Sequence, residues 1–202
     1  MEHTAPIVVP ASQAANSARS AGKNCKGDCM SQLLHAFSGQ IKNVLGQLNL
    51  QRCKCEACFQ TAVVDSVAGV REIPQSKRNR KVGFFGFRPK CSDLMYEQDG
   101  SRNRLLIECK LIRKDNVYDI RNGLLQLIEY MKLDEQDDRD KSGCLLVLDK
   151  RNEATSFKNK LNMWLINNLA HLYRNFALVH IRRKAYSWTC EVIEPAFEET
   201  NR

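Results

Sequence analysis

The chain has 202 residues and a formal net charge of +8, because 31 Lys and Arg outnumber 23 Asp and Glu. This length is enough for one domain with a hydrophobic core, and two full domains are not expected. The positive charge favours polyanionic partners such as nucleic acid. No segment approaches the roughly 18 consecutive apolar residues of a membrane span, and the N-terminus has no secretory apolar block. We therefore expect a soluble, intracellular protein of the cytoplasm or nucleus, with no membrane partner.

The N-terminal third predicts a tail followed by two helices. Residues 1–24 are rich in Ala, Ser, Asn and Gln, which is typical of a disordered tail. From Met30 to Leu48, apolar residues recur every three to four positions, as in an amphipathic helix. Cys53 to about Val70 predicts a cysteine-rich turn that leads into a second helix.

The middle of the chain changes from helical to extended spacing. The basic run Lys77–Lys81 comes first; such a run is usually an ordinary exposed loop, and the alternative is a segment that contacts phosphates. Strands are expected at Val82–Phe87, Asp93–Glu97 and Arg104–Leu111, and the last two are joined by a turn at Asp99-Gly100.

The second half alternates helices and strands. Val117–Leu133 and Phe157–Tyr173 have helical spacing, and the wholly apolar run Cys144–Leu148 indicates a buried strand. Ala177–Ile181 and Ala185–Ile193 are expected to be the two final strands. This order predicts an α/β fold in which helices flank a central mixed sheet.

The hairpin brings three charged side chains together. With a two-residue turn at Asp99-Gly100, the register sets Asp93 opposite Leu106. Leu106, Glu108 and Lys110 share one face, because side chains alternate along a strand. We therefore expect Asp93, Glu108 and Lys110 to converge.

A divalent cation is one physical explanation for this cluster. Mg²⁺ prefers oxygen ligands and usually takes one or two carboxylates with waters and substrate phosphate, so Asp93 and Glu108 are candidate ligands. Lys110 would orient or activate the attacking water and offset charge on the phosphate. The alternative is a solvent-exposed strand face with an ordinary Glu–Lys pair.

The pattern Ser92-Asp93 followed by Ile107-Glu108-Cys109-Lys110 resembles the D…ExK signature of the PD-(D/E)XK, or restriction-endonuclease-like, nuclease superfamily. Ser stands where the Pro of the motif's name would be. The family's order of helix, three strands, helix and parallel strand is similar to the expected order over residues 55–150. The resemblance implies a nuclease-like domain over residues 55–197, and the helical spacing and cysteines in front of it predict a cysteine-rich helical element over residues 25–60 that is a candidate for metal binding.

The resemblance also implies roles for individual residues. Asp93 and Glu108 would bind Mg²⁺ or Mn²⁺, with the carbonyl of Cys109 as a further ligand, and Lys110 would be the catalytic lysine.

Gln126 and Tyr130, four residues apart on the next helix, resemble the QxxxY motif of the RecB-like and lambda-exonuclease-like branch, which lies beside the active site. As unrelated amphipathic residues they would carry no function. The family usually adds an acid or a His from its first helix, and Glu56 and His35 are both candidates.

Five cysteines form two groups near the N-terminus. They are Cys25, Cys29, Cys53, Cys55 and Cys58. Two such groups are what a structural four-thiolate Zn²⁺ site draws on. The alternatives are an iron-sulfur cluster, as in some RecB-like nucleases, and free, partly buried thiols.

The sequence thus predicts a Mg²⁺- or Mn²⁺-dependent nuclease that acts on nucleic acid, with DNA preferred over RNA by family analogy. The alternative is a catalytically silent nucleic-acid-binding or assembly module with a zinc element. A subunit that needs a partner, as a homodimer or in a larger complex, is also left open.

Overall fold

The computed structural model describes residues 26–73, 93–98, 103–114, 117–133, 141–151, 157, 176–184 and 187–194. Its helices are α1 (Lys26–Val44), α2 (Glu56–Ser66) and α4 (Val117–Leu133). Its strands are β1 (Val70–Glu72), β2 (Leu94–Glu97), β3 (Arg104–Ile112), β4 (Lys141–Asp149), β5 (Phe176–Lys184) and β6 (Ser187–Ile193).

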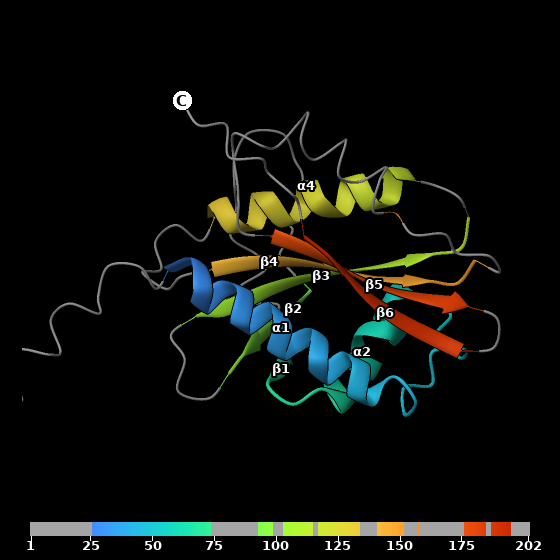
Figure 1. Ribbon diagram of the computed structural model, residues 1–202. Helices are drawn as coiled ribbons and strands as arrows, with labels where there is room; N and C mark the ends of the chain where they lie inside the picture. The colour runs from blue at the N-terminus through green and yellow to red at the C-terminus, as the bar shows by residue number, and fades with distance from the viewer. Residues whose placement is uncertain are drawn as a thin grey trace, which may run out of the picture.

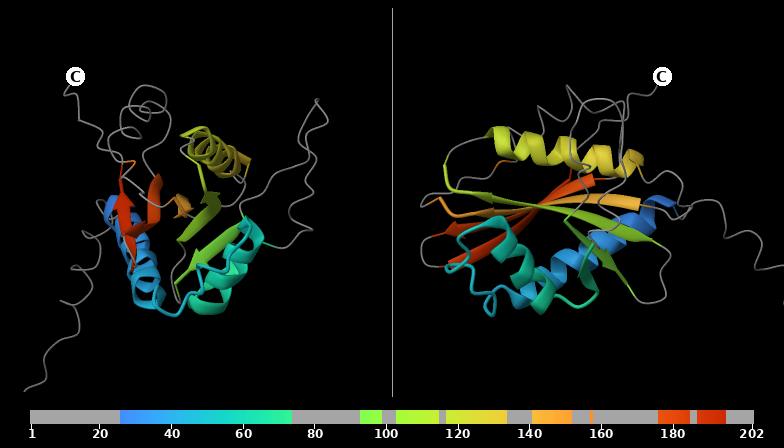
Figure 2. Two further views of the ribbon diagram at one scale, coloured as in Figure 1. Left: turned by 90° about the vertical axis from the view of Figure 1, so that its right-hand side faces the viewer. Right: turned by 180° about the vertical axis from the view of Figure 1, so that it is seen from behind.

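The six strands form one open, mixed sheet in the order β1-β2-β3-β4-β5-β6. The pairs β1/β2, β2/β3 and β5/β6 are antiparallel, whereas β3, β4 and β5 are parallel. Helix α4 covers one face, while α1 and α2 cover the other (Figures 1 and 2). The predicted α/β fold with helices flanking a mixed sheet is therefore confirmed.

Each face of the sheet has its own apolar core. Beneath α1 and α2, the core includes Phe37 and Phe59 together with Ile107 of β3. Beneath α4, it includes Leu127 together with Leu145 of β4. Because side chains alternate along a strand, β3 contributes to both cores. Its carboxyl-terminal half also contributes Glu108 and Lys110 to the candidate site.

The predicted hairpin forms, but its register differs by two residues. Leu106 pairs with Met95 instead of Asp93, and the last pair before the connection is Glu97 with Arg104. Six residues, 98–103, therefore separate the strands where a two-residue turn was expected. A shift by two preserves which face each side chain occupies, so Asp93 remains on the face of Glu108.

The second helix is shorter than predicted, because the chain turns into β1 at its end. Helix α2 stops at Ser66, and Val70 already pairs with Tyr96 of β2. Gly69 makes this turn at φ +78°, and a Cβ there would lie 2.6 Å from the Glu97 carbonyl oxygen. The backbone approaches too closely for any side chain.

Other predicted elements have mixed outcomes. The helix at Val117–Leu133 and the buried strand around Cys144–Leu148 are confirmed, and the two final strands form an antiparallel pair. The first helix begins and ends four residues before its predicted bounds of Met30 and Leu48. In the described part of the chain, no helix is long and apolar enough to span a membrane.

Several predictions concern residues outside those that the structure describes. They are the tail over residues 1–24, the basic run Lys77–Lys81, the strand Val82–Phe87, the turn Asp99-Gly100 and the helix Phe157–Tyr173 apart from Phe157 itself.

Candidate active site

The candidate site lies where β3 extends past its neighbour. Strand β2 begins at Leu94, which pairs with Ile107, whereas β3 continues to Ile112. Among the strands that the structure describes, none pairs with the end of β3 on this side. The backbone there needs other hydrogen-bond partners.

Two carboxylates occupy this edge. Oδ2 of Asp93 accepts a hydrogen bond from the backbone N–H of Cys109 at 2.9 Å. Oε1 of Glu56, the first residue of α2, lies 3.4 Å from the donor nitrogen of Leu111. The edge of β3 thus brings together an acid that precedes β2 and an acid from a helix more than 50 residues away in sequence.

Glu108 and Lys110 complete the cluster from β3 itself. Lys110 Nζ donates to Glu108 Oε1 at 2.7 Å and lies 3.7 Å from Glu56 Oε2. Glu108 is only 3% exposed. Burial, reinforced by the charge of Asp93 and opposed by Lys110, raises the pKa of Glu108 to about 7. Burial lowers the pKa of Lys110, but Glu108, Glu56 and Asp93 together outweigh it, so the net direction is upward.

This geometry fits a hard divalent cation. Glu108 Oε2 is buried and, among the described residues, has no hydrogen-bond partner. The Cys109 carbonyl is directed to the same side as its N–H, toward Asp93, because a strand residue points both groups one way. No three His, Cys, Asp or Glu of the described ranges form a metal-binding group. A cation would therefore depend on two carboxylates, a carbonyl and water, which is a usual donor set for Mg²⁺.

Helix α4 packs directly over the lysine. A Cβ on Gly123 would lie 3.1 Å from Cγ and 3.2 Å from Cε of Lys110. Three residues further on, Gln126 is half-buried, and its Oε1 is another buried atom without a hydrogen-bond partner in the described part of the chain. Tyr130 is buried in the core beneath α4. The predicted roles of Gln126 and Tyr130 beside the active site stay predictions.

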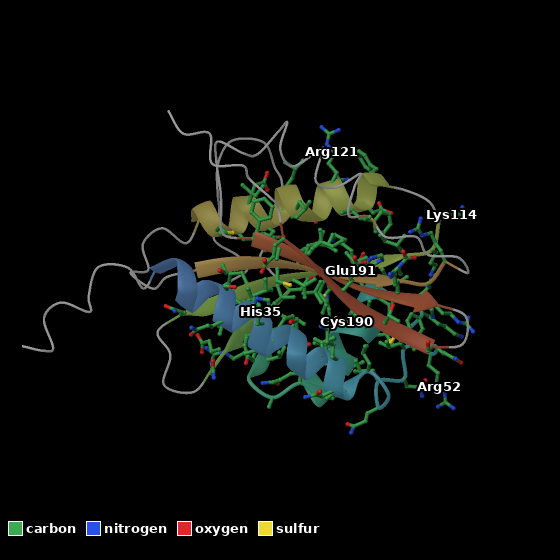
Figure 3. The ribbon with its side chains drawn as sticks, in the orientation of Figure 1. His35, Arg52, Lys114, Arg121, Cys190 and Glu191 are labelled. Atoms are coloured by element: carbon green, nitrogen blue, oxygen red, sulfur yellow. The ribbon has the colours of Figure 1, made fainter. Side chains whose placement is uncertain are left out.

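The structure distinguishes the two candidates for the fourth group. Glu56 lies against Lys110 and Leu111, as described above. His35 is on the exposed side of α1, where its Nε2 lies 3.9 Å from Glu194 Oε1 (Figure 3). Of the two candidates, only Glu56 lies at the cluster of Asp93, Glu108 and Lys110.

The cysteine group is described only in part. Cys53 is buried, and its thiol contacts the carbonyl oxygens of Asn49 and Cys58 at 3.7 and 3.8 Å. Burial, reinforced by Cys58, raises the pKa of Cys53 to about 11. Sγ of Cys55 caps α2 by accepting the N–H of Cys58.

The remaining two predicted zinc ligands cannot be placed in this group, because Cys25 and the side chain of Cys29 lie outside the described residues. The zinc site and its iron-sulfur alternative stay predictions.

Sequence reasoning did not find a second charged group on the α4 face. Asp149 is fully buried at the end of β4. Its two oxygens share the Nε–H of Arg151, at 3.0 and 3.2 Å, and its Oδ2 also accepts from Arg151 Nη2 at 2.7 Å. His180 Nε2 lies 3.1 Å from Asp149 Oδ2, and Phe157 packs against both the guanidinium and the imidazole. The available signal was a single acid, Asp149, that directly follows the wholly apolar run Cys144–Leu148.

No protein-family model, curated protein or solved structure matches the chain. The functional interpretation therefore depends on the geometry of the site.

Proposed function

We propose that the chain is a nuclease of the PD-(D/E)XK type, which hydrolyses phosphodiester bonds with Mg²⁺ or Mn²⁺ and prefers DNA to RNA. The observation that carries the proposal is the cluster of Asp93, Glu108, Lys110 and Glu56 at one edge of the sheet. The carboxylate oxygens of Asp93 and Glu108 are ligands that a divalent cation prefers, and Lys110 lies beside them.

The arrangement of elements supports the same proposal. Helix α2 is followed by three antiparallel strands, β1 to β3, then by α4 and by β4 parallel to β3. This is the element order that the resemblance implies for a restriction-endonuclease-like core.

Each residue has a role that its position explains. Asp93, Glu108 and the Cys109 carbonyl would hold the metal ion, which when bound polarises the phosphate and lowers the pKa of water. Lys110 places its positive charge next to the scissile phosphate and orients the attacking water. Glu56 restrains the Lys110 ammonium from the other side of the strand edge.

Burial argues against the alternative of a silent binding module. Glu108 is almost completely removed from water, although two other carboxylates lie nearby. A buried acid in such surroundings costs stability, and proteins retain that cost mostly at functional sites. A module that only binds nucleic acid has no use for a buried carboxyl group such as that of Glu108.

The proposal is tested by incubating labelled single- and double-stranded DNA and RNA with the protein in Mg²⁺, Mn²⁺ or EDTA. Lys110→Met and Glu108→Gln should each lower cleavage by about a hundredfold or more. Glu97→Gln is the matched control, because Glu97 is on the neighbouring strand and pairs with Arg71 outside the site. Cleavage that persists in EDTA, or full activity of Lys110→Met, would contradict the proposal. Salt-sensitive binding without cleavage would favour the silent module.

A further inference from the structure

We propose that Lys150, assisted by Arg113, is a positioning residue of the active site: it fixes the turn that precedes α2 and so holds Glu56 against Lys110. This inference rests on the nuclease function proposed above and deepens it by assigning a residue that touches neither metal nor substrate.

Lys150 fastens the turn to the end of β4. Its Nζ donates to the carbonyl oxygens of Gln51 and Cys53, both at 2.9 Å. Its backbone N–H donates to the Ile112 carbonyl at 2.8 Å, which ties the base of the side chain to the end of β3. The residue is therefore held at both ends, by the sheet and by the turn.

Arg113 makes a similar connection between the turn before α2 and the end of β3, the strand next to β4. Its Nη2 donates to the carbonyl oxygen of Lys54. Cys55 then caps α2, and Glu56 is the first residue of the helix. The backbone of the turn is thus held to the sheet by charge-assisted hydrogen bonds, which are stronger than those between neutral groups.

The two cations occupy equivalent places on adjacent parallel strands. Arg113 directly follows the last residue of β3, and Lys150 directly follows the last residue of β4. By the alternation of side chains, both are on the α2 face, whereas Glu108 and Lys110 are on the α4 face. Glu56 reaches Lys110 only around the edge of β3, so its position depends on where the turn is held.

The packing of α2 against the sheet is too slight to fix the position of Glu56 alone. The helix has 11 residues, and only Phe59 and Val63 among them are buried. A helix this short is marginal without tertiary contacts. Removing the Lys150 ammonium should therefore release the first turn of α2, and with it Glu56, before it affects the sheet.

A double-mutant cycle between Lys150→Met and Glu56→Gln tests the inference on two quantities, kcat/KM for nucleic acid and the Kd for Mn²⁺. Lys150→Met alone should weaken at least one of them about tenfold, as is usual for residues that orient metal-site groups. In the Glu56→Gln background it should change neither by more than about twofold, because the residue it positions is already gone. Lys150→Arg should keep most of the wild-type value of both.

Lys54→Met is the matched control, because only the backbone of Lys54 takes part in the turn contacts. Amide exchange of residues 58–60, the first hydrogen-bonded N–H groups of α2, should accelerate in Lys150→Met and not in Lys54→Met. If Lys150→Met does not fold, Arg113→Met tests the same connection.

Two outcomes overturn the inference. The first is an additive cycle, in which Lys150→Met causes the same loss whether residue 56 is Glu or has been changed to Gln. The second is amide exchange of residues 58–60, whose N–H groups are the first in α2 to be hydrogen-bonded, that stays at the wild-type rate in Lys150→Met. If the wild-type protein cuts no nucleic acid, the nuclease proposal is refuted instead. The amide exchange rates and the Kd for Mn²⁺ then still test whether Lys150 positions Glu56.

Discussion

Asp149 shows how a single residue keeps its charge inside the fold. It is fully buried, and burial alone would raise its pKa, yet hydrogen bonds from His180 and Arg151 bring that pKa down to about 2. Arg151 also lies over the ring of Phe157, 4.5 Å from its centroid. The aspartate therefore organises an arginine that follows β4 and a histidine in the middle of β5.

Asp149→Asn should lower the free energy of unfolding by about 3 kcal/mol at pH 7, because it leaves the largely buried Arg151 without its counter-ion. The pKa of Asp149 is lower in the folded than in the unfolded state, so its stabilisation is complete above the unfolded pKa near 4 and is lost as pH falls toward 2. The difference between wild type and variant should thus narrow by about 1 kcal/mol between pH 5 and pH 3. Urea unfolding of the wild type and of Asp149→Asn at several pH values measures this difference in the free energy of unfolding.

The control for this measurement is Asp65→Asn, since Asp65 is an exposed acid on α2. It should leave both the stability and its pH dependence almost unchanged. A gap between wild type and Asp149→Asn that stays constant from pH 5 to pH 3 would contradict the ionised, hydrogen-bonded state of Asp149.

At the scale of elements, two glycines allow α4 to pack closely against the sheet. A Cβ on Gly123 would lie 2.7 Å from Leu145 and against the stem of Lys110. A Cβ on Gly143 of β4 would lie 2.8–2.9 Å from Leu127 and Met131 of α4. Both positions need the space that a missing side chain leaves, but only the first touches the candidate catalytic lysine.

Gly123→Ala and Gly143→Ala should therefore separate packing from catalysis. Each adds a methyl group to a filled core and should cost about 1 kcal/mol of stability, since the overpacking penalty exceeds the conformational gain of alanine. Only Gly123→Ala displaces Lys110, so only it should lower kcat beyond what its stability explains. Thermal unfolding and cleavage rates for the pair check this. Equal losses of kcat in both variants would show that α4 does not position the lysine.

The sequence predicted elements well where periodicity extends over several turns or strand residues. The bounds of α4 follow from the spacing of its apolar residues, and the buried run at Cys144–Leu148 lies within β4. Strand β1 has only three residues, and a segment that short gives no alternation to detect. The hairpin register was wrong because it depends on the length of the connection, although the parity of the two strands preserved the shared face.

The candidate site was predictable only as far as its residues are close in sequence. Asp93, Glu108 and Lys110 belong to one hairpin, so counting along two strands could place them together. Glu56 approaches from the opposite face of the sheet, and its contact with Lys110 depends on how α2 packs at the strand edge. No spacing rule connects Lys150 to the turn before α2.

At the scale of the whole molecule, the candidate site and a set of exposed cations share the carboxyl end of β3. Lys114 follows the strand, Arg52 belongs to the turn before α2, and Arg121 is near the start of α4 (Figure 3). The turn is fixed to this end through Lys150 and Arg113. A polyanion that reaches the site from outside would therefore pass these side chains.

Replacing Arg52, Lys114 and Arg121 together by Gln should weaken binding of DNA and flatten its salt dependence. Each lost phosphate contact removes about one unit from the slope of log K against log salt, so the slope should fall by up to about three. Arg71→Gln is the control, because Arg71 of β1 is already paired with Glu97 of β2 at 2.7 Å, outside the candidate site. Fluorescence anisotropy with labelled DNA in EDTA, from low to moderate salt, measures binding without cleavage. If the triple variant keeps the wild-type slope, the polyanion does not contact these three side chains and enters by another route.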